Sequence, residues 1–372
     1  MALALWACQP VSNSAGSATG ASNPRPSQRM YVGTGQPDTA ASIFTIRFFP
    51  GDGSFESENQ YMGVRGPGYL TVAPSRKFLY SVNGMPGETE GGISAFALDA
   101  ATGGLTLLNQ QLTKGRGPCY VSTDPAGKWA FVANYSSGSV AAFPIQADGR
   151  LGEASSSIQH EGSGPNAARQ EGPHAHYSAM GPVGRVYVPD LGIDKVMVYN
   201  VDASGQLSPA TPPALIAEPG GGPRHMDFHP NQRWIYVLNE LAGSVSVFDA
   251  KSYERLQTIA TLPEDFDLPS KSADIHVHPN GKFLYASNRS DNSSIAVYSV
   301  DPATGLLTFV EREHEGINVP RNFTLDPSGR YLIAANLDGN TLTSYRIDEA
   351  SGALTPTGQS IEVPKPMCIK WE

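Results

Sequence analysis

Residues 278–288 read HPNGKFLYASN, and this stretch indicates the fold because similar stretches recur along the chain. Five further copies are APSRKFLYSVN (73–83), DPAGKWAFVAN (124–134), GPVGRVYVPD (181–190), HPNQRWIYVLN (229–239) and DPSGRYLIAAN (326–336). Each copy is a turn with Gly, Pro or Asn, then a basic residue, then a largely apolar strand that ends in Asn or Asp. A shorter copy, RMYVGT, ends at Thr34.

The spacing of these copies is regular. Their last residues are Asn83, Asn134, Asp190, Asn239, Asn288 and Asn336, at intervals of 51, 56, 49, 49 and 48, and Thr34 lies 49 residues before Asn83. A period near 49 predicts a repeat architecture. After each copy comes a third strand, such as SVSVFDA (244–250), and a turn such as DPATGLLT (301–308) that leads into a fourth strand. Four antiparallel strands per repeat are typical of a propeller blade.

The first strands of the repeats give the number of blades. Seven can be counted: GYLTVAP, CYVSTDP, HAHYSAMGP, RHMDFHP, ADIHVHP, RNFTLDP and MCIKWE. The last has no strand after it, and RMYVGT has no strand before it. We therefore expect residues 366–372 to supply the inner strand of the blade built from residues 29–58, which closes the ring and removes an open sheet edge. The prediction is an all-β, seven-bladed β-propeller over residues 29–372.

The composition agrees with this fold and excludes other classes of protein. The chain has 372 residues with 39 Gly and 30 Pro, too many for a bundle of long helices. With 26 basic and 35 acidic residues the formal charge is −9, so general nucleic-acid binding is not expected. No apolar run of about 20 residues predicts a transmembrane helix. The 3 Cys residues fit no disulfide framework, and no CxxC, HExxH or EF-hand motif predicts a metal or other cofactor.

Residues 1–28 lack strand periodicity and form a separate predicted segment. They begin MALALWAC and continue with Ser, Asn, Ala, Gly and Pro, the composition of an unstructured tether. Leu5-Trp6-Ala7-Cys8 is similar to a bacterial lipoprotein processing site, although Trp6 is bulky and no basic residue precedes Arg25. Two expectations follow: a disordered tail on a cytoplasmic protein, or an exported protein with a lipid anchor at Cys8.

Polar residues that do not recur from blade to blade are the candidates for function. The start of a first strand and the end of a second strand lie at the same edge of an antiparallel sheet, and hence at one mouth of the ring. The candidates at these positions are His174, His176, Arg224, His225, Asp274, His276 and Arg321 in first strands, and Tyr135, Glu240 and Arg289 after second strands. His160, His229, His278 and His314 fall in turns or loops and are left out.

This set of residues suits an anionic substrate with a polarised carbonyl group. Arg224 and Arg289 can bind carboxylate or phosphate oxygens with paired hydrogen bonds and stabilise an oxyanion. Glu240, or one of His174 and His176, can move a proton. Glu240 is favoured as the base because no other acidic residue directly follows the repeated Asn. No Ser nucleophile motif occurs, so water is the expected nucleophile.

Five motifs resemble those of the seven-bladed propeller lactonases, a family that includes bacterial 6-phosphogluconolactonase and the fungal carboxy-muconate lactonising enzyme. They are NYSSGSV (134–140), GPHAH (172–176), GPRH (222–225), LNEL (238–241) and FLYASNRSDNSSIAVY (283–298), in family order within residues 29–372. The resemblance implies four catalytic residues, here His174 or His176, Arg224, Glu240 and Arg289. Tyr135, His225, His276 and Arg321 are then expected to contact the substrate. Asp274 departs from the family, which often has Glu before Ile-His.

Three functions follow from these observations. The first is hydrolysis of a sugar lactone, with 6-phosphogluconolactone as the leading substrate, and a phosphorylated substrate implies a cytoplasmic location. The second is the reverse chemistry, lactonisation of a carboxylated muconate by the same pair of arginines. The third is a non-catalytic binding scaffold, because a propeller fold alone does not prove an activity. The expected partner is a small anionic lactone, and no oligomeric state is predicted.

Overall fold

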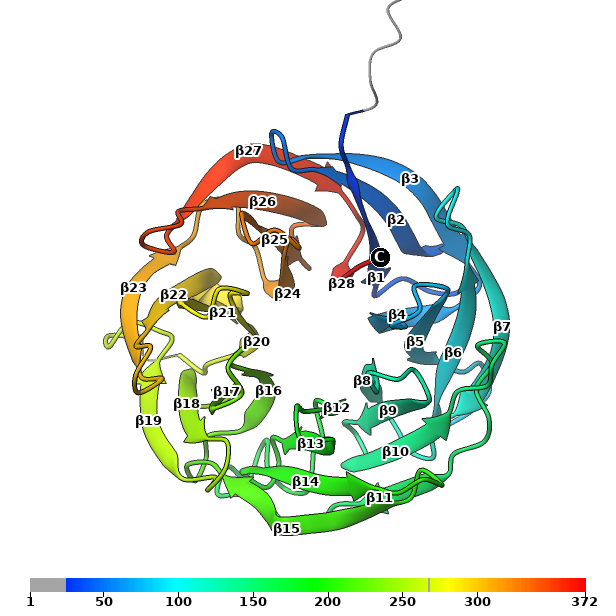
Figure 1. Ribbon diagram of the computed structural model, residues 1–372, viewed down its shortest axis with the longest axis horizontal. Helices are drawn as coiled ribbons and strands as arrows, with labels where there is room; N and C mark the ends of the chain where they lie inside the picture. The colour runs from blue at the N-terminus through cyan, green and yellow to red at the C-terminus, as the bar shows by residue number, and fades with distance from the viewer. Residues whose placement is uncertain (1–24, 267) are drawn as a thin grey trace, which may run out of the picture.

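The computed structural model describes residues 25–266 and 268–372, and this part of the chain folds into a ring of seven four-stranded sheets (Figure 1). The first strand of each sheet lies at the centre of the ring and the fourth lies outside. The prediction of a seven-bladed, all-β propeller is confirmed. The described residues contain a single short 3₁₀ turn, η1 (Ser290–Asn292), and no helix long and apolar enough to span a bilayer.

The strand bounds follow the repeat. The closing blade contains β28 (Pro366–Trp371), β1 (Gln28–Thr34), β2 (Ala41–Phe49) and β3 (Ser54–Met62). The next two contain β4 (Arg65–Val72), β5 (Phe78–Gly84), β6 (Gly91–Leu98) and β7 (Leu105–Leu112), then β8 (Pro118–Thr123), β9 (Trp129–Asn134), β10 (Ser139–Pro144) and β11 (Ser156–Gln159). The fourth contains β12 (Ala179–Met180), β13 (Arg185–Asp190), β14 (Lys195–Val201) and β15 (Leu207–Ile216).

The remaining three blades have the same order. They contain β16 (Pro223–Phe228), β17 (Trp234–Asn239), β18 (Ser244–Asp249) and β19 (Arg255–Ala260), then β20 (Ser272–Val277), β21 (Phe283–Asn288), β22 (Ser294–Val300) and β23 (Leu307–Glu313). The last contains β24 (Pro320–Leu325), β25 (Tyr331–Asn336), β26 (Thr341–Ile347) and β27 (Leu354–Glu362).

The two ends of the chain meet in one sheet, as predicted. β28 pairs antiparallel with β1, and Val32 lies opposite Ile369 in the register. In Figure 1 the red β28 lies inside the blue strands β1 to β3. Arg29 stabilises this junction because its guanidinium group contacts Glu58 at 2.7 Å and the side chain of Glu372 at 2.9 Å. Closure therefore rests on backbone pairing and on a charged contact across both ends.

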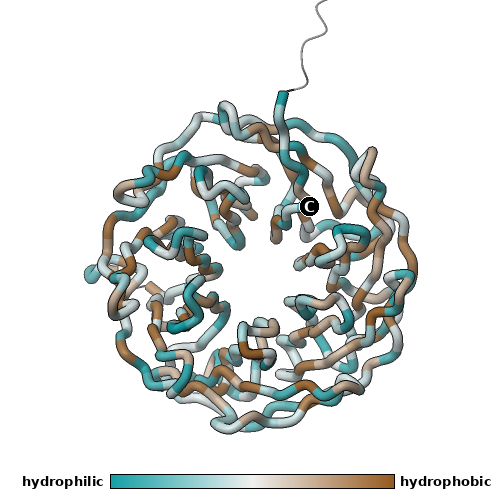
Figure 2. Tube along the Cα trace, in the orientation of Figure 1, coloured by the Kyte–Doolittle hydropathy of each residue, from teal (hydrophilic) through white to brown (hydrophobic). Residues whose placement is uncertain are grey.

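The core lies between neighbouring blades. Apolar residues occur in every blade (Figure 2), and second strands such as β17 and β21 are buried along their whole length, as expected for strands covered on both faces by neighbouring blades. The apolar members pack in layers, such as Phe48 against Tyr331 with ring centroids 5.2 Å apart. The recurrent Asn residues serve the backbone, as Asn288 does by donating to the Thr261 carbonyl oxygen at 3.0 Å.

One inner strand is shorter than the sequence predicts. HAHYSAMGP was expected to form a complete first strand, but only Ala179–Met180 do so, together with a single bridge between Ala175 and Asp190. The Asp190 side chain accepts a hydrogen bond from the His174 backbone N–H at 2.6 Å and so competes with regular ladder pairing.

The proposed tether lies almost entirely outside the described residues. Residues 1–24, including Cys8 and the lipoprotein-like segment, are not described, so the tether and anchor predictions are untested. Among the described residues, Arg25 contacts Asp52 at 3.3 Å and lies 3.7 Å above the Phe49 ring, and β1 begins at Gln28. Residues 25–28 therefore pack on the closing blade.

Candidate active site

Bulges at the starts of the inner strands bring chemically capable side chains to one mouth of the ring. The register shifts between Pro118 and Tyr120 in β8, between Pro223 and His225 in β16, and between Pro320 and Asn322 in β24. The extra residue of each bulge leaves the regular alternation of the strand, which re-aims its side chain. These extra residues are Cys119, Arg224 and Arg321, and all three line a cavity of about 130 Å³.

The register also distinguishes His176 from His174. Pro118 pairs with Asn134 and Pro223 with Asn239, and in the fourth blade Ala175 takes this place opposite Asp190. His176 therefore corresponds in position to Cys119 and Arg224, and it lines the same cavity.

His174 is used differently. Its Nδ1 lies 3.0 Å from the Tyr135 carbonyl oxygen and its Nε2 lies 3.2 Å from Glu171. Its ring stacks on Tyr135, with centroids 4.5 Å apart. Of the two histidines that the sequence could not separate, His176 faces the cavity and His174 supports Tyr135.

A second cavity of about 290 Å³ adjoins the first and shares Cys119, His176 and Arg321 with it. Glu240 lies in its wall and is 5% exposed. This carboxylate contacts three arginines, at 2.9 Å from Arg169, 2.9 Å from Arg224 and 3.0 Å from Arg289. The contact with Arg224 Nε is an ion pair without the directed geometry of a hydrogen bond.

Arg321 is the fourth arginine of the site and lines both cavities. Within the described residues, its guanidinium group has no hydrogen bond or ion pair with a protein acceptor, in contrast to Arg169, Arg224 and Arg289. Four guanidinium groups and one carboxylate, that of Glu240, thus line the two cavities, and these five groups together carry a net positive charge. Such an excess attracts anions.

The electrostatics of the site follow from its burial. Burial favours the neutral carboxylic acid of Glu240, but Arg289, Arg224 and Arg169 outweigh this and lower its pKa to about 2. Burial, together with Arg224, lowers the pKa of Arg289 to about 9 and that of Arg321 to about 10. Burial also holds the pKa of His176 well below its ordinary value, so its imidazole is neutral near pH 7.

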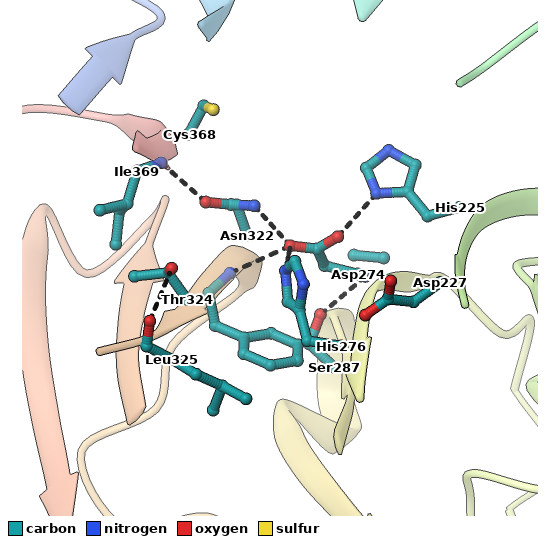
Figure 3. Close-up of polar contacts among 12 residues, drawn as sticks. His225, Asp227, Asp274, His276, Ser287, Asn322, Thr324, Leu325, Cys368 and Ile369 are labelled. Carbon is teal, nitrogen blue, oxygen red and sulfur yellow. Dashed lines mark hydrogen bonds and ion pairs between the residues drawn. The ribbon is translucent and has the colours of Figure 1, made fainter. Parts of the chain in front are cut away.

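A second layer of inner-strand residues forms the floor of the site. Tyr69, Tyr120 and Tyr177 pack against one another, with centroids 4.0 Å and 4.3 Å apart, and His225 contacts Tyr120 at 5.3 Å. Asp274 continues this layer, since its Oδ1 lies 2.7 Å from His225 Nδ1 (Figure 3). Tyr69 and His225 of this layer line the smaller cavity.

The structure brings together most of the predicted residues but places His174, His276 and Asp274 outside both cavities. Arg224, Arg289, Arg321, His176, His225, Tyr135 and Glu240 all line one cavity or the other. His174 does not, for the reason given above. His276 lies two residues beyond Asp274 in β20, about 6.6 Å further along the strand, where its Nε2 is 3.1 Å from Asp274 Oδ2 and its ring packs on Phe323. The expectation that His276 contacts the substrate at this mouth finds no support in that position.

Two residues of the site were not predicted from the sequence. Arg169 lies in the segment between β11 and β12 and donates to Glu240 and, at 3.3 Å, to the Tyr135 hydroxyl oxygen. The interval of 56 between Asn134 and Asp190, the longest in the chain, marked this insertion. Cys119 is the extra residue of the bulge in β8, and its position directly after Pro118 was the available signal. Burial raises the pKa of Cys119 to about 12, so it is a thiol rather than a nucleophilic thiolate.

This arrangement suits the opening of an ester-like bond in an anionic substrate. A neutral imidazole at His176 can accept a proton, and guanidinium groups can bind an anionic group and stabilise an oxyanion.

Comparisons with known proteins show which proteins this chain is similar to. The family model described as "Lactonase, 7-bladed beta-propeller" matches residues 29–371. A 6-phosphogluconolactonase of Bacillus subtilis is 35% identical over 92% of this chain and 97% of its own length, and one of Formosa agariphila is 33% identical over 90% and 96%. Among solved structures, a putative 6-phosphogluconolactonase from Bacteroides fragilis superposes with a TM-score of 0.87 at 37% identity, covering 93% of this chain and 98% of that one. The periplasmic gluconolactonase of Pseudomonas aeruginosa gives a TM-score of 0.86 at 33% identity, covering 93% and 99%.

Proposed function

The chain belongs to the family of seven-bladed β-propeller lactonases, and from this premise we propose that it hydrolyses 6-phosphogluconolactone to 6-phosphogluconate. The observation that carries the choice of an anionic lactone is the excess of guanidinium groups around Glu240, with Arg321 free of any acceptor among the described residues. A lactone that carries a phosphate supplies the missing anion. The relatives named 6-phosphogluconolactonase support the same substrate.

In the proposed mechanism, His176 acts as the base. Its imidazole is neutral and lines both cavities, so it can take a proton from a water molecule as the water oxygen attacks the lactone carbonyl carbon. An arginine of the site stabilises the oxyanion that forms. The ring C–O bond then breaks, the imidazolium returns its proton to the departing oxygen as a hydroxyl group, and the new carboxylic acid ionises.

Glu240 receives a different role from the one its sequence position favoured. Both of its carboxylate oxygens are held by arginines, Oε1 by Arg169 and Oε2 by Arg224 and Arg289, so neither oxygen is free to take a proton from water. We assign to it the positioning of these three arginines.

An unphosphorylated aldonolactone is the second candidate substrate. The support for it is the similarity to the periplasmic gluconolactonase of Pseudomonas aeruginosa. A substrate panel of 6-phosphogluconolactone, gluconolactone and carboxy-muconate separates these candidates, and it also tests the lactonising reaction. We expect the highest kcat/KM with 6-phosphogluconolactone after spontaneous hydrolysis has been subtracted. Faster turnover of gluconolactone or cyclisation of the muconate would contradict the proposal.

The two histidines of GPHAH provide a matched pair for the mechanism. We expect His176→Gln to lower kcat by about 10²-fold or more, because the base is lost. His174→Gln, two residues away, should keep kcat within about threefold, because His174 lies outside both cavities. Melting curves of both variants control for folding. If His174→Gln is the more damaging change, the assignment of the base is wrong.

A further inference from the structure

Asp274 is a buried acid to which the mechanism above gives no role. Asp274 is 1% exposed and belongs to the blade that follows the one carrying Arg224 and His225. One of its carboxylate oxygens, Oδ1, lies 2.7 Å from His225 Nδ1. The other, Oδ2, contacts the Asn322 amide, the Phe323 backbone N–H at 3.3 Å, and His276 (Figure 3).

These contacts determine where the proton of His225 lies. A carboxylate can only accept a hydrogen bond, so His225 Nδ1 must carry a hydrogen. On the other side of the ring, His225 Nε2 lies 3.2 Å from Arg224 Nη1, and a guanidinium group can only donate. Both neighbours therefore require the same form of the ring, a neutral imidazole with its hydrogen on Nδ1. Burial and Arg224 lower the pKa of His225 to about 3, which agrees with a neutral ring.

We propose that Asp274 is a positioning residue of the lactonase reaction, which fixes the tautomer of His225 so that Nε2 holds Arg224 in its place in the site. A continuous chain of polar contacts then runs from Asp274 through His225 and Arg224 to Glu240. Arg224 Nη1 also donates to the carbonyl oxygen of Ala273, the residue before Asp274. This proposal rests on the proposed function in one respect, which is that lactone hydrolysis is one of the two quantities measured to test it.

Asp274 is itself held from several blades, as a positioning residue requires. Its backbone N–H donates to Ser287 Oγ at 3.0 Å. The amide of Asn322, which donates to Asp274, accepts a hydrogen bond from the Ile369 backbone N–H at 2.7 Å through its own oxygen. Burial alone would raise the pKa of Asp274, but His276 and His225 hold it well below its ordinary value, so it remains a carboxylate.

Asp274→Asn tests the proposal because it keeps the size of the side chain and removes the charge. The new amide has one oxygen, while Asp274 now accepts from both His225 on one oxygen and Asn322 on the other. If the NH₂ group of the new Asn faces His225, the hydrogen of His225 must move to Nε2, where it opposes the N–H groups of Arg224. If the NH₂ group faces Asn322 instead, the hydrogen bond with Asn322 is lost. We expect kcat to fall by about 10²-fold with KM changed less than about fivefold, as for a triad Asp whose replacement gives the wrong imidazole tautomer.

A double-mutant cycle separates positioning through His225 from a merely structural role. His225→Phe keeps a ring against Tyr120 and Tyr177 but removes both nitrogens. If Asp274 acts through His225, the double variant Asp274→Asn/His225→Phe should have a kcat within about threefold of His225→Phe alone. Asp227→Asn is the matched control, because Asp227 is a neighbouring, partly buried acid that accepts from the Val277 N–H and has no hydrogen bond with His225 among the described residues. We expect this control to remain within about threefold of wild type.

A direct measurement needs no variant at Asp274. Nitrogen NMR of the ¹⁵N-histidine protein, with His225→Phe used to assign the signals, should show His225 neutral with its hydrogen on Nδ1 at pH 7. A hydrogen on Nε2, an imidazolium, losses that multiply in the cycle, or Asp274→Asn with near-wild-type kcat would each overturn the proposal. If wild type hydrolyses no lactone above background, the proposed function fails, while the NMR result still decides the tautomer of His225.

Discussion

At the scale of single residues, the site is defined by which charges have partners. Glu240 has three guanidinium partners, whereas Arg321 has none among the described residues that could accept from it. The sequence predicted both residues at one mouth because neither recurs from blade to blade. It could not predict the pairing, because that depends on side-chain reach across three blades. An unpaired arginine beside a cavity can bind an anionic ligand without first giving up a contact with a protein carboxylate.

Arg321→Met is therefore expected to discriminate between charged and neutral lactones. We predict that kcat/KM for 6-phosphogluconolactone falls by about 10²-fold, which corresponds to the loss of a charge-assisted contact of roughly 2.7 kcal/mol. The kcat/KM for gluconolactone should fall less than about fivefold. Arg116→Met is the control, since exposed Arg116 lies near the same mouth and its loss changes the net charge equally. Equal losses for the two lactones would mean that Arg321 acts on the carbonyl group they share.

Glu240 should also couple folding to pH. Its pKa in the folded protein is lowered to about 2 from an ordinary value of 4.5, so the unfolded chain binds the proton more readily. The stability that this carboxylate contributes is then fully present above about pH 4.5 and is lost as the pH falls toward 2, to a total of roughly 3 kcal/mol. We predict that the difference in free energy of unfolding between wild type and Glu240→Gln, measured in urea, shrinks between about pH 5 and pH 3. A difference that does not change with pH would show that Glu240 titrates normally in the folded protein.

At the scale of strands, the periodicity of the sequence predicted the blades but did not predict the bulges at the starts of the inner strands. The Pro residues that begin β8, β16 and β24 cannot donate to the sheet ladder, and the residue after each is the bulged one. By this pattern Pro173 would select His174. The structure instead places His176 at the cavity, because Ala175 takes the pairing position opposite Asp190 in the fourth blade, whose inner strand is short.

The strand scale also explains why Arg169, one of the two site residues not predicted from the sequence, was missed. Arg169 comes from an insertion outside the repeat, and its role depends on how that loop folds back over Glu240. Comparison between blades identifies residues that differ within a shared pattern, but an inserted segment has no counterpart with which to compare it. The 56-residue interval showed that this segment is longer than its counterparts, but it did not predict the contact between Arg169 and Glu240.

At the scale of the whole molecule, the site exists only if the ring is closed. Each cavity is lined by residues of several blades, and the smaller one includes Met367 of the last strand together with Gly68 of β4 and Cys119 of β8. Ile369 in the same last strand donates to Asn322, which holds Asp274. The last strand, β28, therefore contributes to the candidate active site as well as to closure of the ring.

Removal of residues 366–372 should consequently abolish both folding of the ring and activity. The deletion exposes the edge of β1 and the buried Val32, and it removes the buried side chains of Cys368 and Ile369. We expect loss of the cooperative melting transition of the wild-type protein. Arg29→Met provides a graded test, because it keeps β28 but removes the contacts with Glu58 and Glu372. It should lower the melting temperature by several degrees, as expected for the loss of partly buried charged contacts worth about 1–3 kcal/mol, with kcat within about threefold of wild type. A truncated chain that melts like wild type would show that the blade of β1 to β3 is stable without its inner strand, and that closure contributes nothing to the stability of the ring.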